Sequence, residues 1–200
     1  MGSKGMNAQV EELLLQALET ERGGIKVYEA AIAAAQNEDL REEWEGYLSE
    51  TRHHEAVLTG VFEQLGLDTE LQSPGREVVA HLGQSLVSAI QMAVSSATPE
   101  AAELVAAECV VLAETKDHHN WELIGRVASQ GGKFAKVLKD AYEEVEKDED
   151  HHLYHTMGWS RELWIQSRGM SAVLPPPEEV RKVETAIGVA RAEQDREKMT

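Results

Sequence analysis

The chain has 200 residues, of which 42% are hydrophobic and 28% charged, proportions that fit a folded globular domain and exclude a disordered one. Acidic residues outnumber basic ones by 36 to 19, so the net charge is −17, which disfavours nucleic acid and anionic membranes as partners and favours cations. The single cysteine, Cys109, excludes an intrachain disulfide and any zinc or iron site built from paired cysteines.

Two features of the sequence indicate where in the cell the protein resides: the first residues of the chain and the length of its apolar runs. Residues 1–7 are expected to form a tail, because they lead into acidic Glu11 and Glu12 rather than into the apolar segment of a signal peptide. No apolar run is expected to approach the roughly 18 residues of a membrane span. We therefore expect a cytoplasmic protein that does not bind a membrane.

Helical periodicity covers most of the chain, interrupted by short breaks rich in Gly, Pro and Asn. Within each periodic stretch, apolar residues recur every three or four positions, which is typical of a helix with one buried face. No segment shows the alternation expected of a strand. The sequence therefore predicts an all-α protein with helices over residues 8–36, 40–65, 76–97, 100–129 and 133–167, and a last amphipathic helix after Pro175–Pro177.

Two of the breaks are short enough to predict antiparallel helix hairpins. They lie at residues 37–39 and 130–132, and the long connection over residues 67–98 joins one hairpin to the other. Two hairpins with one long helical crossover are the connectivity of a ferritin-like four-helix bundle. We expect this bundle over residues 8–169 and a proline-linked C-terminal helix over residues 170–200.

Carboxylates interrupt the apolar face of each of the four long bundle helices. Burying an unpaired carboxylate costs several kcal/mol, and several in one core repel each other unless cations lie between them. The segments 50–53 (ETRH) and 149–152 (EDHH) share the pattern Glu-x-x-His, which puts a carboxylate and an imidazole one turn apart on one helix face. The interrupting residues are Glu21, Glu50, Glu114 and Glu149.

The spacing of these glutamates predicts that they meet. Glu21 and Glu50 lie almost equally far from the first break, and Glu114 and Glu149 almost equally far from the second. Residues equidistant from the turn of an antiparallel hairpin lie at one level. The sequence therefore predicts one metal site with the ligands Glu21, Glu50, His53, Glu114, Glu149 and His152.

The order Glu…Glu-x-x-His…Glu…Glu-x-x-His over four helices resembles the dimetal-carboxylate branch of the ferritin-like superfamily, which includes rubrerythrins, bacterioferritins and several oxygenases. The segments 50–53 and 147–152 are locally similar to aldehyde-deformylating oxygenases. The resemblance implies two irons bridged or chelated by Glu50 and Glu149. It assigns one ion the further ligands Glu21 and His53, and the other ion Glu114 and His152.

Several neighbouring residues keep two interpretations. Asp148 and His151 repeat the Glu-x-x-His spacing one position earlier and offer an alternative helix phase. His118 lies one turn beyond Glu114, where it is either a further ligand or a histidine outside the ligand shell. By default we expect exposed side chains at His151 and His155, and packing in the core at Tyr28 and Trp121.

Carboxylate and imidazole ligands suit ferrous ions that react with dioxygen or peroxide, and they are equally compatible with manganese. The favoured function is a diiron oxidoreductase that acts on peroxide itself or on a small organic substrate. Two alternatives stay open: a ferroxidase or iron-storage protein, and a non-catalytic helical bundle that binds a partner. The terminal helix is expected to dock on the bundle or on a second copy in a homodimer.

Overall fold

The computed structural model describes residues 7–179 and 182–199, and the side chains of residues 182–189 and 193 lie outside that description. Helices are the only regular elements among the described residues, which confirms the all-α class. Residues 1–6 of the expected tail lie outside the described part. The helices are α1 (Ala8–Ala34), α2 (Glu38–Leu65), α3 (Pro74–Ser96), α4 (Pro99–Ser129), α5 (Ala135–Ser167) and α6 (Lys182–Met199).

Local side-chain chemistry sets where these helices begin and end. Asn37 Oδ1 accepts a hydrogen bond from the Leu40 N–H over 3.1 Å, so α2 begins at Glu38, slightly earlier than the apolar pattern predicts. Ser73 and Thr98 cap α3 and α4 in the same way, and each precedes a proline whose missing N–H costs a helix start nothing.

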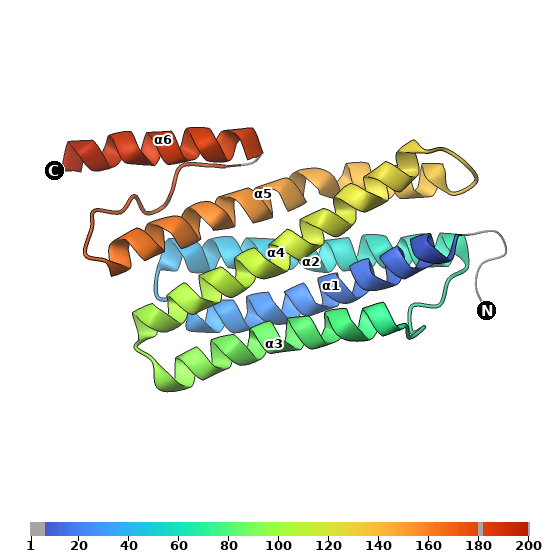
Figure 1. The fold of residues 1–200 in the computed structure, drawn as a ribbon, viewed down its shortest axis with the longest axis horizontal. Coiled ribbons are helices and arrows are strands. Elements are labelled where there is room, and N and C mark those ends of the chain that lie inside the picture. Colours follow the sequence, from blue (N-terminus) through green and yellow to red (C-terminus); the bar gives the residue numbers. More distant parts are fainter. Residues whose placement is uncertain (1–6, 180–181, 200) are drawn as a thin grey trace.

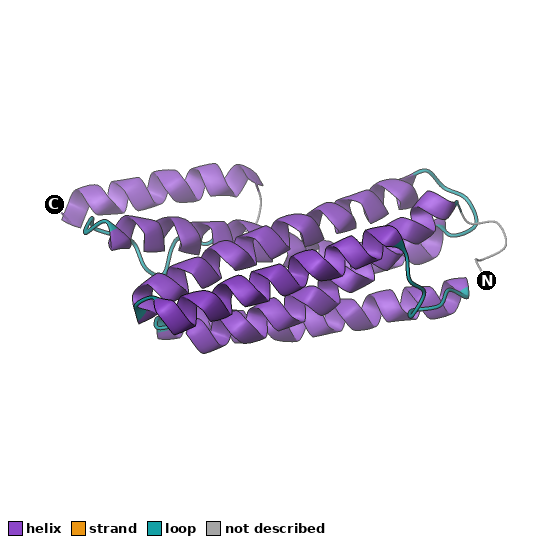
Figure 2. Ribbon diagram, turned by 60° about the horizontal axis from the view of Figure 1, so that its bottom comes forward, coloured by secondary structure: helices purple, strands orange, loops and turns teal. Residues whose placement is uncertain are grey.

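The long helices pack into a bundle of two antiparallel hairpins, α1–α2 and α4–α5 (Figure 1). α1 packs against α4 and α2 against α5, so these four helices surround one core. α3 links the hairpins and lies outside that core, against α1 and α4. Figure 2 shows the C-terminal α6 along one side of the bundle, where it contacts α5.

Buried polar side chains divide the apolar core in two. One apolar cluster, which includes Tyr28, Trp44 and Trp159, lies toward the α1–α2 turn. The other, which includes Leu18 and Trp121, lies toward the opposite end. Because several kcal/mol are lost when a charged group is buried unpaired, the polar layer between the two clusters is the part of the core that needs an explanation.

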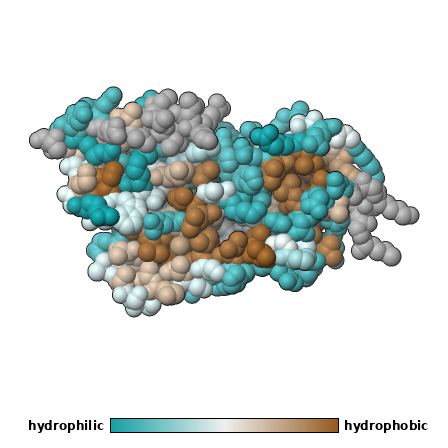
Figure 3. Space-filling model, in the orientation of Figure 1, coloured by the Kyte–Doolittle hydropathy of each residue, from teal (hydrophilic) through white to brown (hydrophobic). Residues whose placement is uncertain are grey.

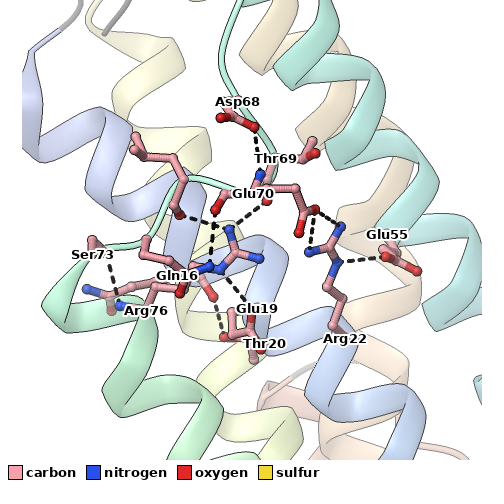
Figure 4. Close-up of polar contacts among 12 residues, drawn as sticks. Gln16, Glu19, Thr20, Arg22, Glu55, Asp68, Thr69, Glu70, Ser73 and Arg76 are labelled. Carbon is pink, nitrogen blue, oxygen red and sulfur yellow. Dashed lines mark hydrogen bonds and ion pairs between the residues drawn. The ribbon is translucent and has the colours of Figure 1, made fainter. Parts of the chain in front are cut away.

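A buried arginine fastens the crossover to the first hairpin (Figure 4). The Arg76 guanidinium, 3% exposed, donates to Glu19 Oε2 over 2.8 Å and to the backbone carbonyls of Thr69 and Leu71 over 2.6 and 3.0 Å. These bonds join the start of α3 to α1 and to the loop before α3.

The outward face of α3 is apolar (Figure 3), with exposed side chains at Val78, Leu82, Met92 and Val94. Residues 78–99 contain no Asp, Glu, Lys or Arg. By length and composition α3 could cross a membrane, with a mean hydropathy of 1.3 over its most apolar stretch, of which 22% is buried. The expectation that no segment approaches the length of a span is therefore wrong. Ser, Gln and Gly residues interrupt the apolar residues of α3, but none of them adds a charge.

Candidate metal centre

Six metal-ligating side chains from all four bundle helices converge in the polar layer of the core. None is more than 3% exposed, although four of them are carboxylic acids. Each lies on the inward face of its helix, among the buried positions of that helix. The six are Glu21 of α1, His54 of α2, Glu114 and Asp117 of α4, and Glu149 and His152 of α5.

Glu149 lies at the centre of this cluster and belongs to two groups of three side chains. One group consists of Glu21, Asp117 and Glu149, the other of His54, Glu149 and His152, and within each group the donor atoms lie within 4.8 Å of one another. His54 Nδ1 is 2.9 Å from Glu149 Oε1 and 4.0 Å from Glu21 Oε2. Each of the two overlapping sets could hold a metal ion.

The fourth carboxylate, Glu114, joins the cluster through His152. Its Oε2 lies 3.7 Å from His152 Nδ1. The imidazoles of His152 and His54 stack with their ring centroids 5.6 Å apart. The two histidines therefore lie on one side of the carboxylates, each close to a different glutamate.

Many polar atoms of this cluster have no hydrogen-bond partner among the described residues. Trp121 Nε1 donates to Glu21 Oε1 over 2.7 Å, but the other oxygen of Glu21 is unpaired. Buried polar atoms are almost always paired, so several unpaired atoms in one place indicate a missing ligand. The unpaired atoms are Glu21 Oε2, Glu114 Oε2, Asp117 Oδ1, Glu149 Oε2, His54 Nε2 and His152 Nδ1.

Burial and mutual repulsion shift the pKa values in this cluster away from the charged forms. Burial, with the charges of Asp117 and Glu149 added, raises the pKa of Glu21 well above its usual 4.5. Burial also raises the pKa of Glu114 to about 7 and lowers that of His54 to about 4. Among the described residues, no lysine or arginine forms an ion pair with any of these carboxylates, and the Lys116 amino group donates to Asn120 instead.

Glu50, a predicted ligand, reaches the same place from the solvent side. Its side chain is 45% exposed, and its Oε2 lies 2.7 Å from His152 Nε2. The hydrogen bond with His152 lowers the pKa of Glu50. The structure thus brings together five of the six predicted residues: Glu21, Glu50, Glu114, Glu149 and His152.

The sixth, His53, lies outside the cluster, and its neighbour His54 lies inside. The His53 side chain is 55% exposed and its Nε2 lies 2.9 Å from Glu144 Oε1. One residue along a helix turns the side chain by about 100°, and the buried positions Thr51, His54 and Leu58 set the inward direction of α2. The two candidate ligands on α2 are therefore spaced as Glu50-x-x-x-His54.

Sequence reasoning missed Asp117, although a signal for it is present. Asp117 follows Glu114 at the same spacing as His152 follows Glu149, so each helix of the second hairpin contributes two residues one turn apart. His118, which had two interpretations, turns away from the cluster, and its Nε2 is 2.7 Å from Asp150 Oδ1.

Comparisons of the chain with protein-family models, with characterised proteins and with solved structures find no match.

Proposed function

We propose that this protein is a ferritin-like dimetal-carboxylate protein that activates dioxygen or peroxide as an oxidoreductase. The observation that carries the proposal is the layer of unpaired, buried carboxylate and imidazole atoms between the two apolar clusters. The two antiparallel hairpins and the single crossover helix are consistent with this superfamily.

The donor set fits two divalent cations. When ionised, Glu21, Glu114, Asp117 and Glu149 carry four negative charges, which balance two divalent ions, while neutral imidazoles add no charge. His54 is suited to this role because burial lowers its pKa to about 4, which leaves the ring neutral at pH 7. Hard carboxylate oxygens together with imidazole favour iron or manganese over softer metals.

The metal pair would supply redox chemistry toward dioxygen or peroxide, and the chain's own residues would control access and ligand position. Trp121 holds one oxygen of Glu21 by a hydrogen bond, which orients the carboxylate. Glu50 is the most exposed residue at the site, so its carboxylate is the one able to move as small molecules enter. Tyr28, 1% exposed, borders the cluster, with its ring 6.3 Å, centroid to centroid, from that of His152.

A pocket beside the site supports an organic substrate rather than iron storage. A space of about 300 Å³ opens between α1, α3 and α4. Its walls include Thr20, which precedes Glu21 on α1, Gly24, which lies about one turn after it, and apolar side chains of the crossover helix such as Val79 and Leu86. Ligand pockets of this kind are mostly apolar and have few polar groups.

The test is metal content followed by reactivity. Protein expressed without a metal-binding tag is analysed by plasma mass spectrometry, and metal-free protein is reconstituted anaerobically with Fe(II) and then exposed to oxygen or peroxide. We expect about two metal ions per chain at the dimetal site and a new ferric absorption band after oxidation. Substitution Glu114→Gln should remove the band, whereas Glu122→Gln, an exposed glutamate on the same helix, should keep it.

Three results would contradict the proposal. Uptake of many iron ions per chain with formation of a large assembly would favour storage. Bound metal without any spectral change on oxidation would argue against oxygen or peroxide chemistry. Absence of metal after reconstitution, with unchanged behaviour of the Glu114→Gln variant, would make the polar layer a structural feature.

A further inference from the structure

A second group of potential ligands lies where α2 and α5 approach the C-terminal segment. Glu43, His151 and His155 place donor atoms within 4.8 Å of one another. The two histidines are four residues apart on α5, and their rings stack with centroids 5.4 Å apart and planes 29° apart. Imidazoles at this spacing project from the same helix face and can bind one ion together.

His155 is the buried member of this group. The sequence leads us to expect an exposed side chain there, but the ring is 2% exposed and packs against Trp159, with centroids 6.4 Å apart. Its Nε2 lies 3.1 Å from Glu43 Oε1, and its Nδ1 has no hydrogen-bond partner among the described residues. The group thus contains a buried imidazole with an unused nitrogen.

Glu43 is held in place by two aromatic residues. Trp159 Nε1 donates to its Oε2 over 2.7 Å, and the Tyr47 hydroxyl donates to its Oε1. These bonds orient a carboxylate that is only 20% exposed, in the way that outer hydrogen bonds orient metal ligands.

The C-terminal segment brings a fourth donor to the group. Glu178 follows the three consecutive prolines, and its Oε2 lies 3.0 Å from His151 Nε2. The Glu178 side chain is 73% exposed, and its neighbour Glu179 forms a 2.8 Å ion pair with Arg161 of α5, which places this segment against the bundle. The group thus combines two imidazoles with the Glu43 carboxylate, and Glu178 approaches it through His151, so the donors come from α2, α5 and the segment after α5.

We propose that Glu43, His151, His155 and Glu178 form a second, mononuclear site for a divalent cation of the zinc type. Two histidines and two carboxylates match the four-coordinate ligation that zinc prefers. The ion would fasten residues 170–179 to α2 and α5. This site is separate from the dimetal cluster, because the two share no ligand.

Tyr47 nevertheless lies between the two sites. Its hydroxyl bonds to Glu43, while its ring lies 4.3 Å, centroid to centroid, from the ring of His152. Occupation of the zinc site is therefore expected to stiffen the side of the dimetal cluster that His152 forms, without adding a ligand to it.

Zinc titration of the full chain tests the proposal, by calorimetry and by metal analysis after dialysis. We expect His151→Ala to bind one zinc fewer per chain than the unaltered protein, and Glu178→Gln to weaken that same zinc about tenfold. His81→Ala, which removes an exposed histidine from α3, should leave zinc binding unchanged. Both test residues are partly or largely exposed, so their replacement does not threaten folding.

Two further measurements separate this site from the dimetal centre. Co²⁺ bound to the Glu114→Gln variant should still give the intense visible bands of tetrahedral coordination, and these bands should vanish in a Glu114→Gln/His151→Ala double variant. Zinc should also slow hydrogen exchange over residues 170–179 in the unaltered protein but not in Glu178→Gln. Equal zinc stoichiometry and affinity in the unaltered protein and in His151→Ala would overturn the proposal and leave Glu43 and His155 as an ion pair.

Discussion

Trp121 of α4 donates its indole N–H to Glu21 Oε1 of α1 over 2.7 Å, so a residue of the second hairpin orients a buried carboxylate of the first. Trp121 lies two turns beyond Glu114 on α4, and Tyr28 lies two turns beyond Glu21 on α1. The buried Tyr28 hydroxyl lies against Glu114 of the other hairpin, and burial together with the nearby Glu114 raises the pKa of Tyr28. The two hairpins thus place an aromatic residue at equivalent positions, and each of these residues meets a glutamate of the other hairpin.

Replacement of Trp121 by phenylalanine should weaken metal binding at the dimetal centre. The ring still fills part of the core, but Glu21 loses the donor that orients it, and loss of such an outer bond typically costs 10- to 100-fold in affinity. Competition with a chelator measures the change. Trp44→Phe is the matched control, because Trp44 is fully buried and its Nε1 has no partner among the described residues. Equal loss in both variants would assign the effect to packing.

The neighbouring histidines of α2 give a second matched comparison. We expect His54→Ala to lower the metal content of the dimetal centre or its affinity at least tenfold, because a buried imidazole next to Glu149 is lost. His53→Ala removes only an exposed contact with Glu144 and should leave metal content unchanged. Plasma mass spectrometry after dialysis decides between them. The reverse result would restore the Glu-x-x-His53 pattern that the sequence suggests.

The metal-free protein should lose stability as pH rises. Glu114 has a pKa of about 7 in the folded chain against 4.5 without burial, so the folded state binds more protons between these values and stability falls with increasing pH. Below about pH 4.5 both states are protonated and the penalty vanishes. Above pH 7 it is complete, on the order of 3 kcal/mol from Glu114 alone.

Thermal unfolding of metal-free and metal-loaded protein between pH 5 and 8 measures this effect. The melting temperature of the metal-free protein should fall across the range, while bound cations compensate the carboxylate charges and flatten the profile. A metal-free melting temperature that rises with pH would mean that the carboxylates are already neutralised within the chain.

Loss of Arg76 should destabilise the fold without touching the metal centre. Arg76→Ala leaves Glu19 and two loop carbonyls without their donor, and breaking such a buried network costs about 3 kcal/mol. The exposed pair of Arg52 with Glu29 is the control, since Arg52→Ala should cost less than about 1 kcal/mol. Urea unfolding gives both values. A similar small loss for both would show that the Arg76 contacts form in exposed, weakly ordered loop structure.

Much of the fold follows from local patterns. The start of α4 was predicted to within one residue from its cap Thr98, whereas α2 and α3 begin two residues earlier than predicted because Asn37 and Ser73 cap them. Glu21 and Glu149 could be placed in the core because each interrupts an apolar face whose neighbours on both sides are buried. The apolar character of α3 was underestimated, because Ser, Gln and Gly interrupt its apolar residues although no charged residue does so over residues 78–99.

The sequence by itself determined the helices, the hairpins and the core positions of Glu21, Glu114 and Glu149, because periodicity and spacing are properties of one helix or one turn. Only the tertiary structure decided between His53 and His54, since adjacent residues differ by about 100° and the rotation of α2 is set by the helices packed against it. The same reason applies to Asp117 and His155, whose burial depends on neighbours from other helices. A ligand set that spans four helices is a property of their packing.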